Sequence, residues 1–139
     1  MAVNTQFSIA VHLMAGLGCC NENAKTSTEL AQSVNTSASF VRRTMAKLSK
    51  AGLVETSKGK SGACWLAKKA KQITLLDIYQ AVAAPKAFAI HAYPESKRCE
   101  VSCNIKGALD RALDQTQKAL ESSLEKITLA DIVADIRKH

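Results

Sequence analysis

The fold of this chain is decided by residues 26–54, TSTELAQSVNTSASFVRRTMAKLSKAGLV. Thr26 and Glu29 have the spacing of a capping box, in which a hydroxyl group and a carboxylate three residues later satisfy free amides at the start of a helix. The short helix that begins there gives way to a second helix, which Ser37 can cap and which Gly52 ends. Two short helices joined by about three residues predict a helix-turn-helix.

A β-hairpin is predicted directly after this pair of helices. Residues 53–56 and 63–66 have the composition of short strands, and the turn at residues 58–62 contains two glycines. A hairpin in this position would be the wing of a winged helix-turn-helix. We expect Cys64, on the second strand, to face the core.

Three further segments carry helical signals. Apolar residues recur at helical spacing in residues 5–17. Residues 73–82 and 127–136 each start with a capping box, in which Thr74 and Thr128 stand three residues before an aspartate. We interpret this echo as one local capping solution used twice, because a repeat protein needs at least three units to bury its core.

A long helix is predicted from about residue 105 to residue 126, after a proline-bounded loop. Its apolar stripe consists of Ile105, Leu109, Leu113, Leu120 and Leu124. At roughly 20 residues, or about 30 Å, this helix is too long for the small N-terminal unit to cover. The stripe therefore predicts a homodimer in which the same helix of a second subunit covers it, with packing onto residues 5–17 of its own chain as the alternative.

These signals together predict a mainly α protein with a small β-hairpin wing, built as a winged helix-turn-helix plus a long dimerisation helix. At 139 residues the chain has no room for two large independent domains. We expect residues 1–82 to form the winged helix-turn-helix DNA-binding domain, residues 83–104 a candidate sensory loop, and residues 105–139 the dimerisation helix and a C-terminal helix.

The positive charge of the chain is concentrated in its N-terminal half. Residues 1–73 hold ten Lys and Arg against three acidic residues, whereas residues 74–139 hold nine of each sign. A concentrated positive surface on a small domain favours a polyanion partner, because each neutralised phosphate releases condensed counterions. The alternative is that the charge only keeps the protein soluble.

Several classes of protein are disfavoured by the sequence. No apolar run approaches the roughly 20 residues of a membrane span, and the first residues lack the basic start of a signal peptide. We therefore expect a cytoplasmic protein without a membrane partner, whose five cysteines are free thiols. Because no catalytic motif stands out, we do not expect an enzyme.

The second helix of a helix-turn-helix enters the major groove of DNA, with its N-terminal residues nearest the base edges. Arg42 and Arg43 are placed there to read a guanine or to hold phosphate, and the sequence leaves both roles open. The N-terminus of the preceding helix and the wing tip supply further phosphate contacts. The predicted DNA-binding residues are Thr26, Ser27, Thr28, Ser37, Ser39, Phe40, Arg42, Arg43, Lys47, Lys58, Lys60 and Ser61.

The candidate sensor residues are Cys99 and Cys103, which lie just before the long helix. Their spacing is not that of a zinc site, and we predict no metal ligands. The neighbouring Lys97 and Arg98 favour a reactive thiol at Cys99. Regulation through oxidation or an electrophile is therefore one hypothesis for this loop.

The order of motifs resembles the Rrf-two family of bacterial transcriptional regulators over essentially the whole chain. The resemblance rests on TELA (28–31), FVRRTMAKLSKAGLV (40–54), the glycine-containing wing that ends at residues 66–67, ITLLDI (73–78) and TLADI (128–132). It implies a dimeric winged-helix protein, usually a repressor, that binds a palindromic operator in double-stranded DNA.

Members of this family that sense iron, iron–sulfur status or nitric oxide carry three loop cysteines, each about five residues apart, which suit cluster ligation. Here Tyr93 stands about where the first of them is expected, and the interval from Cys99 to Cys103 is too short. The chain thus resembles the members without a cluster, and we expect no cofactor. The alternatives are a regulator that senses through an iron–sulfur cluster and one that acts mainly by binding a partner protein.

Overall fold

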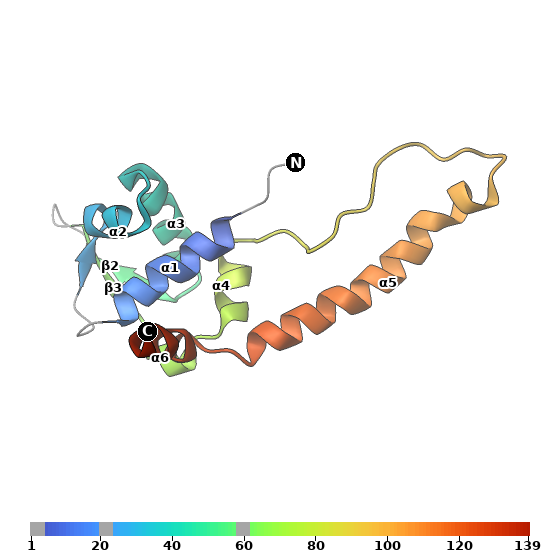
Figure 1. Cartoon of the computed structure of the whole chain (residues 1–139). Coiled ribbons are helices and arrows are strands. Elements are labelled where there is room, and N and C mark those ends of the chain that lie inside the picture. Colours follow the sequence, from blue (N-terminus) through green and yellow to red (C-terminus); the bar gives the residue numbers. More distant parts are fainter. Residues whose placement is uncertain (1–4, 20–23, 58–61) are drawn as a thin grey trace.

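The computed structural model describes residues 5–19, 24–57 and 62–139. Its elements are α1 (Gln6–Gly18), β1 (Lys25–Thr26), α2 (Ser27–Val34), α3 (Ala38–Lys50), β2 (Val54–Thr56), β3 (Ala63–Leu66), the 3-10 helix η1 (Ala70–Gln72), α4 (Leu75–Ala81), α5 (Glu100–Glu125) and α6 (Leu129–Lys138). The small sheet lies at the edge of a group of helices, and α5 reaches away from this group on the other side (Figure 1). The predicted fold class is confirmed.

The helix-turn-helix forms as its caps predict. Thr26 and Glu29 make the reciprocal capping box at the start of α2, and the Thr26 hydroxyl oxygen accepts the Glu29 amide at 3.1 Å. Asn35 then turns the chain in the left-handed region with a φ of 68°. The Ser37 hydroxyl oxygen accepts the Phe40 amide at 3.2 Å and starts α3. The two caps therefore fix where α2 and α3 begin, and Asn35 forms the turn between them.

The hairpin belongs to a sheet of three strands in the order β1-β3-β2. The β2 and β3 strands pair antiparallel, with Val54 opposite Leu66. On the other side, Lys25 of β1 pairs with Cys64 of β3. The β1 strand was not predicted, because two residues are too few for an alternating pattern. The expectation for Cys64 is confirmed, since its side chain is buried.

The core is built around α1, whose Leu13, Met14 and Leu17 are fully or almost fully buried. The helix continues through its glycines to Gly18. A Cβ atom at Gly16 would lie 3.3 Å from the Leu30 side chain, so the glycine allows α2 to approach α1 closely.

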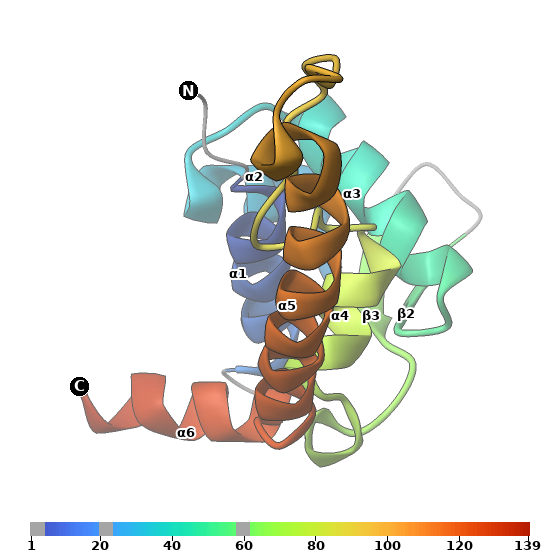
Figure 2. The same cartoon turned by 90° about the vertical axis from the view of Figure 1, so that its right-hand side faces the viewer.

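The two echoing segments pair with each other. The Leu75 amide donates to the Ile127 carbonyl at 2.8 Å, and the Leu129 amide donates to the Ile73 carbonyl at the same distance. This reciprocal antiparallel bridge places α6 against α1 and η1. The α6 helix therefore packs onto the N-terminal elements, and it turns away from α5 where that helix ends (Figure 2).

The α5 helix begins at Glu100, earlier than the predicted start near residue 105. Cys99 is the reason, because its sulfur accepts the Ser102 amide at 3.4 Å and acts as the N-cap. The helix has 26 residues and is thus about 39 Å long. Residues 83–99 run along it as an irregular segment to its far end (Figure 1).

Candidate nucleic-acid interface

The two faces of α3 differ in burial and in charge. Val41, Met45 and Leu48 are buried in the core, whereas Arg42 and Arg43 are exposed on the opposite side. Ser37, Ser39 and Lys47 are exposed as well. The inner residues fix the helix to the domain, so the outer residues are presented on a rigid element.

The arginine side chains are held by neighbours on α3. The Arg42 guanidinium donates to the Ser39 hydroxyl oxygen at 3.4 Å, and the Arg43 guanidinium lies 5.8 Å from the centre of the Phe40 ring. Phe40 is only half-exposed and supports Arg43 by a cation–π contact.

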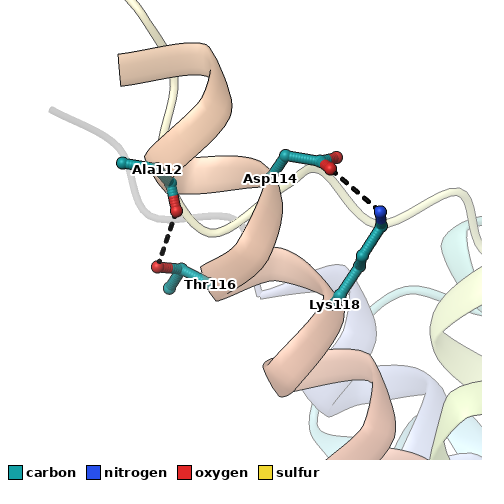
Figure 3. A network of polar contacts seen from close by, with 4 residues as sticks. All are labelled: Ala112, Asp114, Thr116 and Lys118. Carbon is teal, nitrogen blue, oxygen red and sulfur yellow. Dashed lines mark hydrogen bonds and ion pairs between the residues drawn. The ribbon is translucent and has the colours of Figure 1, made fainter. Parts of the chain in front are cut away.

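Among the described residues, neither arginine has an acidic partner. Within the part of the chain that the structure describes, the one ion pair joins Lys118 to Asp114 at 3.1 Å on α5 (Figure 3). No acidic side chain of the described residues neutralises the charges of Arg42 and Arg43, so both guanidinium groups are available to an anion.

An open hollow of about 410 Å³ lies between the start of α2, the α3 helix and the hairpin. Ser27 and Arg42 line it together, although they are 15 positions apart. Sequence reasoning did not identify Ser49 and Thr56, which line the same hollow. No local motif marks these two hydroxyl groups, because only the packing of the hairpin against α3 brings them to this surface.

The other predicted DNA-binding residues differ in their exposure to solvent. Thr28 is exposed near the start of α2. Thr26 is half-buried, and its hydroxyl group is used within the capping box, where it donates to a Glu29 carboxylate oxygen at 3.2 Å. Lys58, Lys60 and Ser61 lie outside the described residues. The structure thus brings Ser27 beside Arg42, whereas Phe40, Arg43 and Lys47 line a second hollow with residues 5–6 near the start of α1. The contacts with DNA stay predictions.

The family of the chain follows from comparison with known proteins. The Rrf2 family model, described as an iron-dependent transcriptional regulator, matches residues 3–135. The chain belongs to the Rrf2 family. This is the Rrf-two family that the sequence motifs resemble.

Relatives in the Rrf2 family agree with this fold over most of the chain. YwnA of Bacillus subtilis (strain 168) is 35% identical to this chain over 133 residues, an alignment that covers 94% of this chain and 96% of YwnA. Its provisional name is HTH-type transcriptional regulator. A solved structure of a provisionally assigned transcriptional regulator from Lactobacillus plantarum has a TM-score of 0.81 and 25% identity and covers 97% of this chain and 91% of that one. Another solved structure, provisionally described as a DNA-binding protein, has a TM-score of 0.73 and 31% identity. The match covers 91% of this chain and 97% of the other.

The description of the Rrf2 family raises the question of an iron centre. Cys99 and Cys103 are the two thiols beside the loop, and both are exposed. Across residues 5–19, 24–57 and 62–139, no three His, Cys, Asp or Glu side chains come together as ligands would. Iron–sulfur clusters are held by cysteine thiolates, usually four. The described residues therefore do not fit a cluster, and its absence remains a prediction.

The end of the irregular segment 83–99 that lies next to the start of α5 makes polar contacts with that helix. The Ser96 amide donates to the Ser102 hydroxyl oxygen at 2.7 Å, and the Cys103 thiol donates to the Ser96 carbonyl at 3.5 Å. The rings of His91 and Tyr93 lie 5.7 Å apart.

The near end of this loop is fixed by a buried glutamine. The Gln117 side chain of α5 donates to the Tyr79 hydroxyl oxygen at 2.9 Å and accepts the Ala87 amide at 3.0 Å. The Tyr79 hydroxyl in turn donates to the Pro85 carbonyl at 2.7 Å. Phe7 of α1 makes an edge contact with the Tyr79 ring. One polar cluster therefore joins α4, α5 and the start of the loop.

Two further observations concern the buried thiol of Cys64 and the apolar character of the helices. Burial raises the pKa of the Cys64 thiol. In the described part of the chain, no helix combines the length and the apolar character that crossing a bilayer requires.

Proposed function

We propose that this Rrf2 regulator is a cytoplasmic homodimeric repressor that binds a palindromic operator in double-stranded DNA and has no catalytic activity. The observation that carries the proposal is the outer face of α3, where the exposed Arg42 and Arg43 have no acidic partner in the part of the chain that the structure describes. Charges of this kind attract the phosphate backbone, and guanidinium groups can also read guanine edges in the major groove. Ser27 adds a hydroxyl group beside Arg42.

Dimerisation through α5 is supported by the exposure of that helix. Gln117 is its one buried residue, although the helix has 26 residues. Leu113 and Leu120, on the predicted apolar stripe, are only half-buried. A second copy of α5 would complete their burial. Two joined subunits would also present two α3 helices, which a palindromic operator requires.

The loop of residues 83–104, with Cys99 and Cys103 near its end, is the proposed sensor of a redox or electrophile signal. Both thiols are exposed, and their hydrogen bonds join the first turn of α5 to the segment before it. We expect the protein to work without an iron–sulfur cluster. Protein purified without oxygen should hold no stoichiometric iron, and stoichiometric iron with acid-labile sulfide would contradict this part of the proposal.

The DNA-binding proposal is tested by fluorescence anisotropy with reduced full-length protein and a DNA fragment from upstream of its own gene. Arg42→Ala or Arg43→Ala should weaken binding by about 1–3 kcal/mol if the lost contact reads a base, and the affinity should fall steeply with salt. Lys118→Ala is the matched control, because Lys118 lies on α5 and pairs with Asp114.

Equal affinity of the wild-type protein and both arginine variants, with the fold intact, would contradict the role of α3. Absence of any DNA binding by the wild-type protein would contradict the proposal and favour a regulator that acts through a partner protein.

A further inference from the structure

The first turn of α5 holds two thiols at one end of the helix. Cys99 is the N-cap, and its backbone is extended, with φ −113° and ψ 118°. Its sulfur accepts the Ser102 amide, while the Cys103 amide donates to the Cys99 carbonyl at 3.0 Å. The Cys103 thiol reaches the Ser96 carbonyl just before the helix. Both sulfur atoms therefore contact the same short stretch of backbone, residues 96–102.

The hydrogen bond from the Cys103 amide to the Cys99 carbonyl places Cys103 one helical turn after Cys99. Residues four apart on a helix have Cβ atoms about 5–6 Å apart. A disulfide requires about 3.5–4.5 Å. By these general values, a displacement of about 1–2 Å would bring residues one turn apart to the separation of a disulfide. Such a displacement is easiest at the end of a helix, and Cys99 is not itself within α5.

We propose that Cys99 and Cys103 of one subunit form a disulfide when the protein meets a peroxide, and that this bond removes the N-cap of α5. The inference rests on the proposed function, because it names the reaction of the sensor segment. It goes further in assigning a different role to each thiol.

The hydrogen bonds distinguish the two roles. The Cys99 sulfur accepts the Ser102 amide at the start of the helix, whereas the Cys103 thiol donates to the Ser96 carbonyl. The Cys99 thiolate attacks one peroxide oxygen, and the O–O bond breaks to give a sulfenic acid and hydroxide, which is protonated to water. The Cys103 sulfur then attacks the Cys99 sulfur, its proton leaves with the hydroxyl group as a second water, and the S–S bond forms.

The disulfide changes the start of α5. It takes the Cys99 sulfur from the Ser102 amide and the Cys103 thiol from the Ser96 carbonyl, two contacts that fix the entry of the chain into the helix. An unsatisfied amide at a helix start destabilises the first turn. Oxidation should therefore loosen the turn next to Lys97 and Arg98, which are exposed.

The test uses full-length protein treated with hydrogen peroxide, quenched with an alkylating reagent and digested with trypsin. Cleavage after Arg98 and Lys106 gives the peptide CEVSCNIK, residues 99–106, which contains both thiols. We expect this peptide without alkyl groups and about 2 Da lighter than the dithiol, because the S–S bond replaces two hydrogen atoms, and reductant should restore the dithiol. Brief digestion of the intact protein should cut after Arg98 faster in the oxidised form.

Variants separate the two roles. Cys103→Ser should stop at a Cys99 sulfenic acid, which dimedone traps, whereas Cys99→Ser should react with peroxide much more slowly. Cys19→Ser, outside this segment, is the matched control and should form the disulfide as the wild-type protein does.

Three results would overturn the inference. They are alkylation of both thiols after peroxide treatment, a bond from either thiol to a cysteine elsewhere, and an unchanged rate of cleavage after Arg98. None of these measurements involves DNA, so a failure here leaves the DNA-binding proposal standing. Conversely, loss of the DNA-binding proposal would leave the peptide result unaffected.

Discussion

Replacing Tyr79 with Phe removes one oxygen atom from the place where α4, α5 and the start of the loop meet. In the wild-type protein that oxygen accepts the Gln117 side-chain amide at 2.9 Å and donates to the Pro85 carbonyl at 2.7 Å. Gln117 is only 8% exposed, so water does not readily replace the lost partner. Because a buried donor without a partner costs about 1–3 kcal/mol, we expect Tyr79→Phe to lower the free energy of unfolding by about that amount.

The assay is urea unfolding at a fixed protein concentration, because the stability of an oligomer depends on its concentration. Gln117→Met keeps a flexible chain of similar length and removes the amide. The double variant should lose less than the sum of the single variants, with a coupling energy of about 1 kcal/mol. Tyr93→Phe is the control, because Tyr93 is 77% exposed, and its effect should stay within about 0.5 kcal/mol. Additive single effects would refute the contact between Tyr79 and Gln117 as a source of stability.

The other predictions concern assembly, capping and thiol reactivity. Leu113→Asp or Leu120→Asp should convert the dimer to a monomer in sedimentation experiments, because a charge would be buried where the two α5 helices meet. Gln115→Asp, on the exposed side of α5, should leave the dimer intact. A wild-type protein that is monomeric at micromolar concentration would contradict the proposed dimer. Thr128→Ala removes the cap of α6 and should lower the free energy of unfolding by about 1 kcal/mol in the same urea assay, and an unchanged midpoint would refute the role of this cap. The raised pKa of Cys64 leaves less thiolate at a given pH, so Ellman's reagent should modify Cys64 more slowly than it modifies the exposed thiols. Equally fast modification would show that Cys64 is accessible.

The helix-turn-helix was predictable because its signals are local. The capping box at Thr26 and the cap at Ser37 act within three residues of sequence, and both were found in place. The exposure of Arg42 and Arg43 was predictable for the same reason, since the period of α3 alone decides which side chains face the core.

Features that depend on distant partners were not predictable from the sequence. The pairing of Thr74 with Thr128 joins segments 54 positions apart, so the echo was interpreted as local. The start of α5 was missed because cysteine is not among the preferred N-cap residues. Phe40 was predicted to contact DNA, and periodicity could not reveal that its ring also supports Arg43.

The central claim, that two α3 helices of a dimer read DNA, is tested most directly by selecting binding sites from a random DNA pool with the reduced full-length protein. We predict enriched sites with two-fold symmetry, whose half-sites are separated by about one helical turn, roughly 10 base pairs, or a multiple of it. Repeating the selection with Arg42→Ala and with Arg43→Ala should remove the preference at one symmetric pair of positions in at least one of the two experiments. Enrichment of an asymmetric single site, or no enrichment at all, would contradict the account.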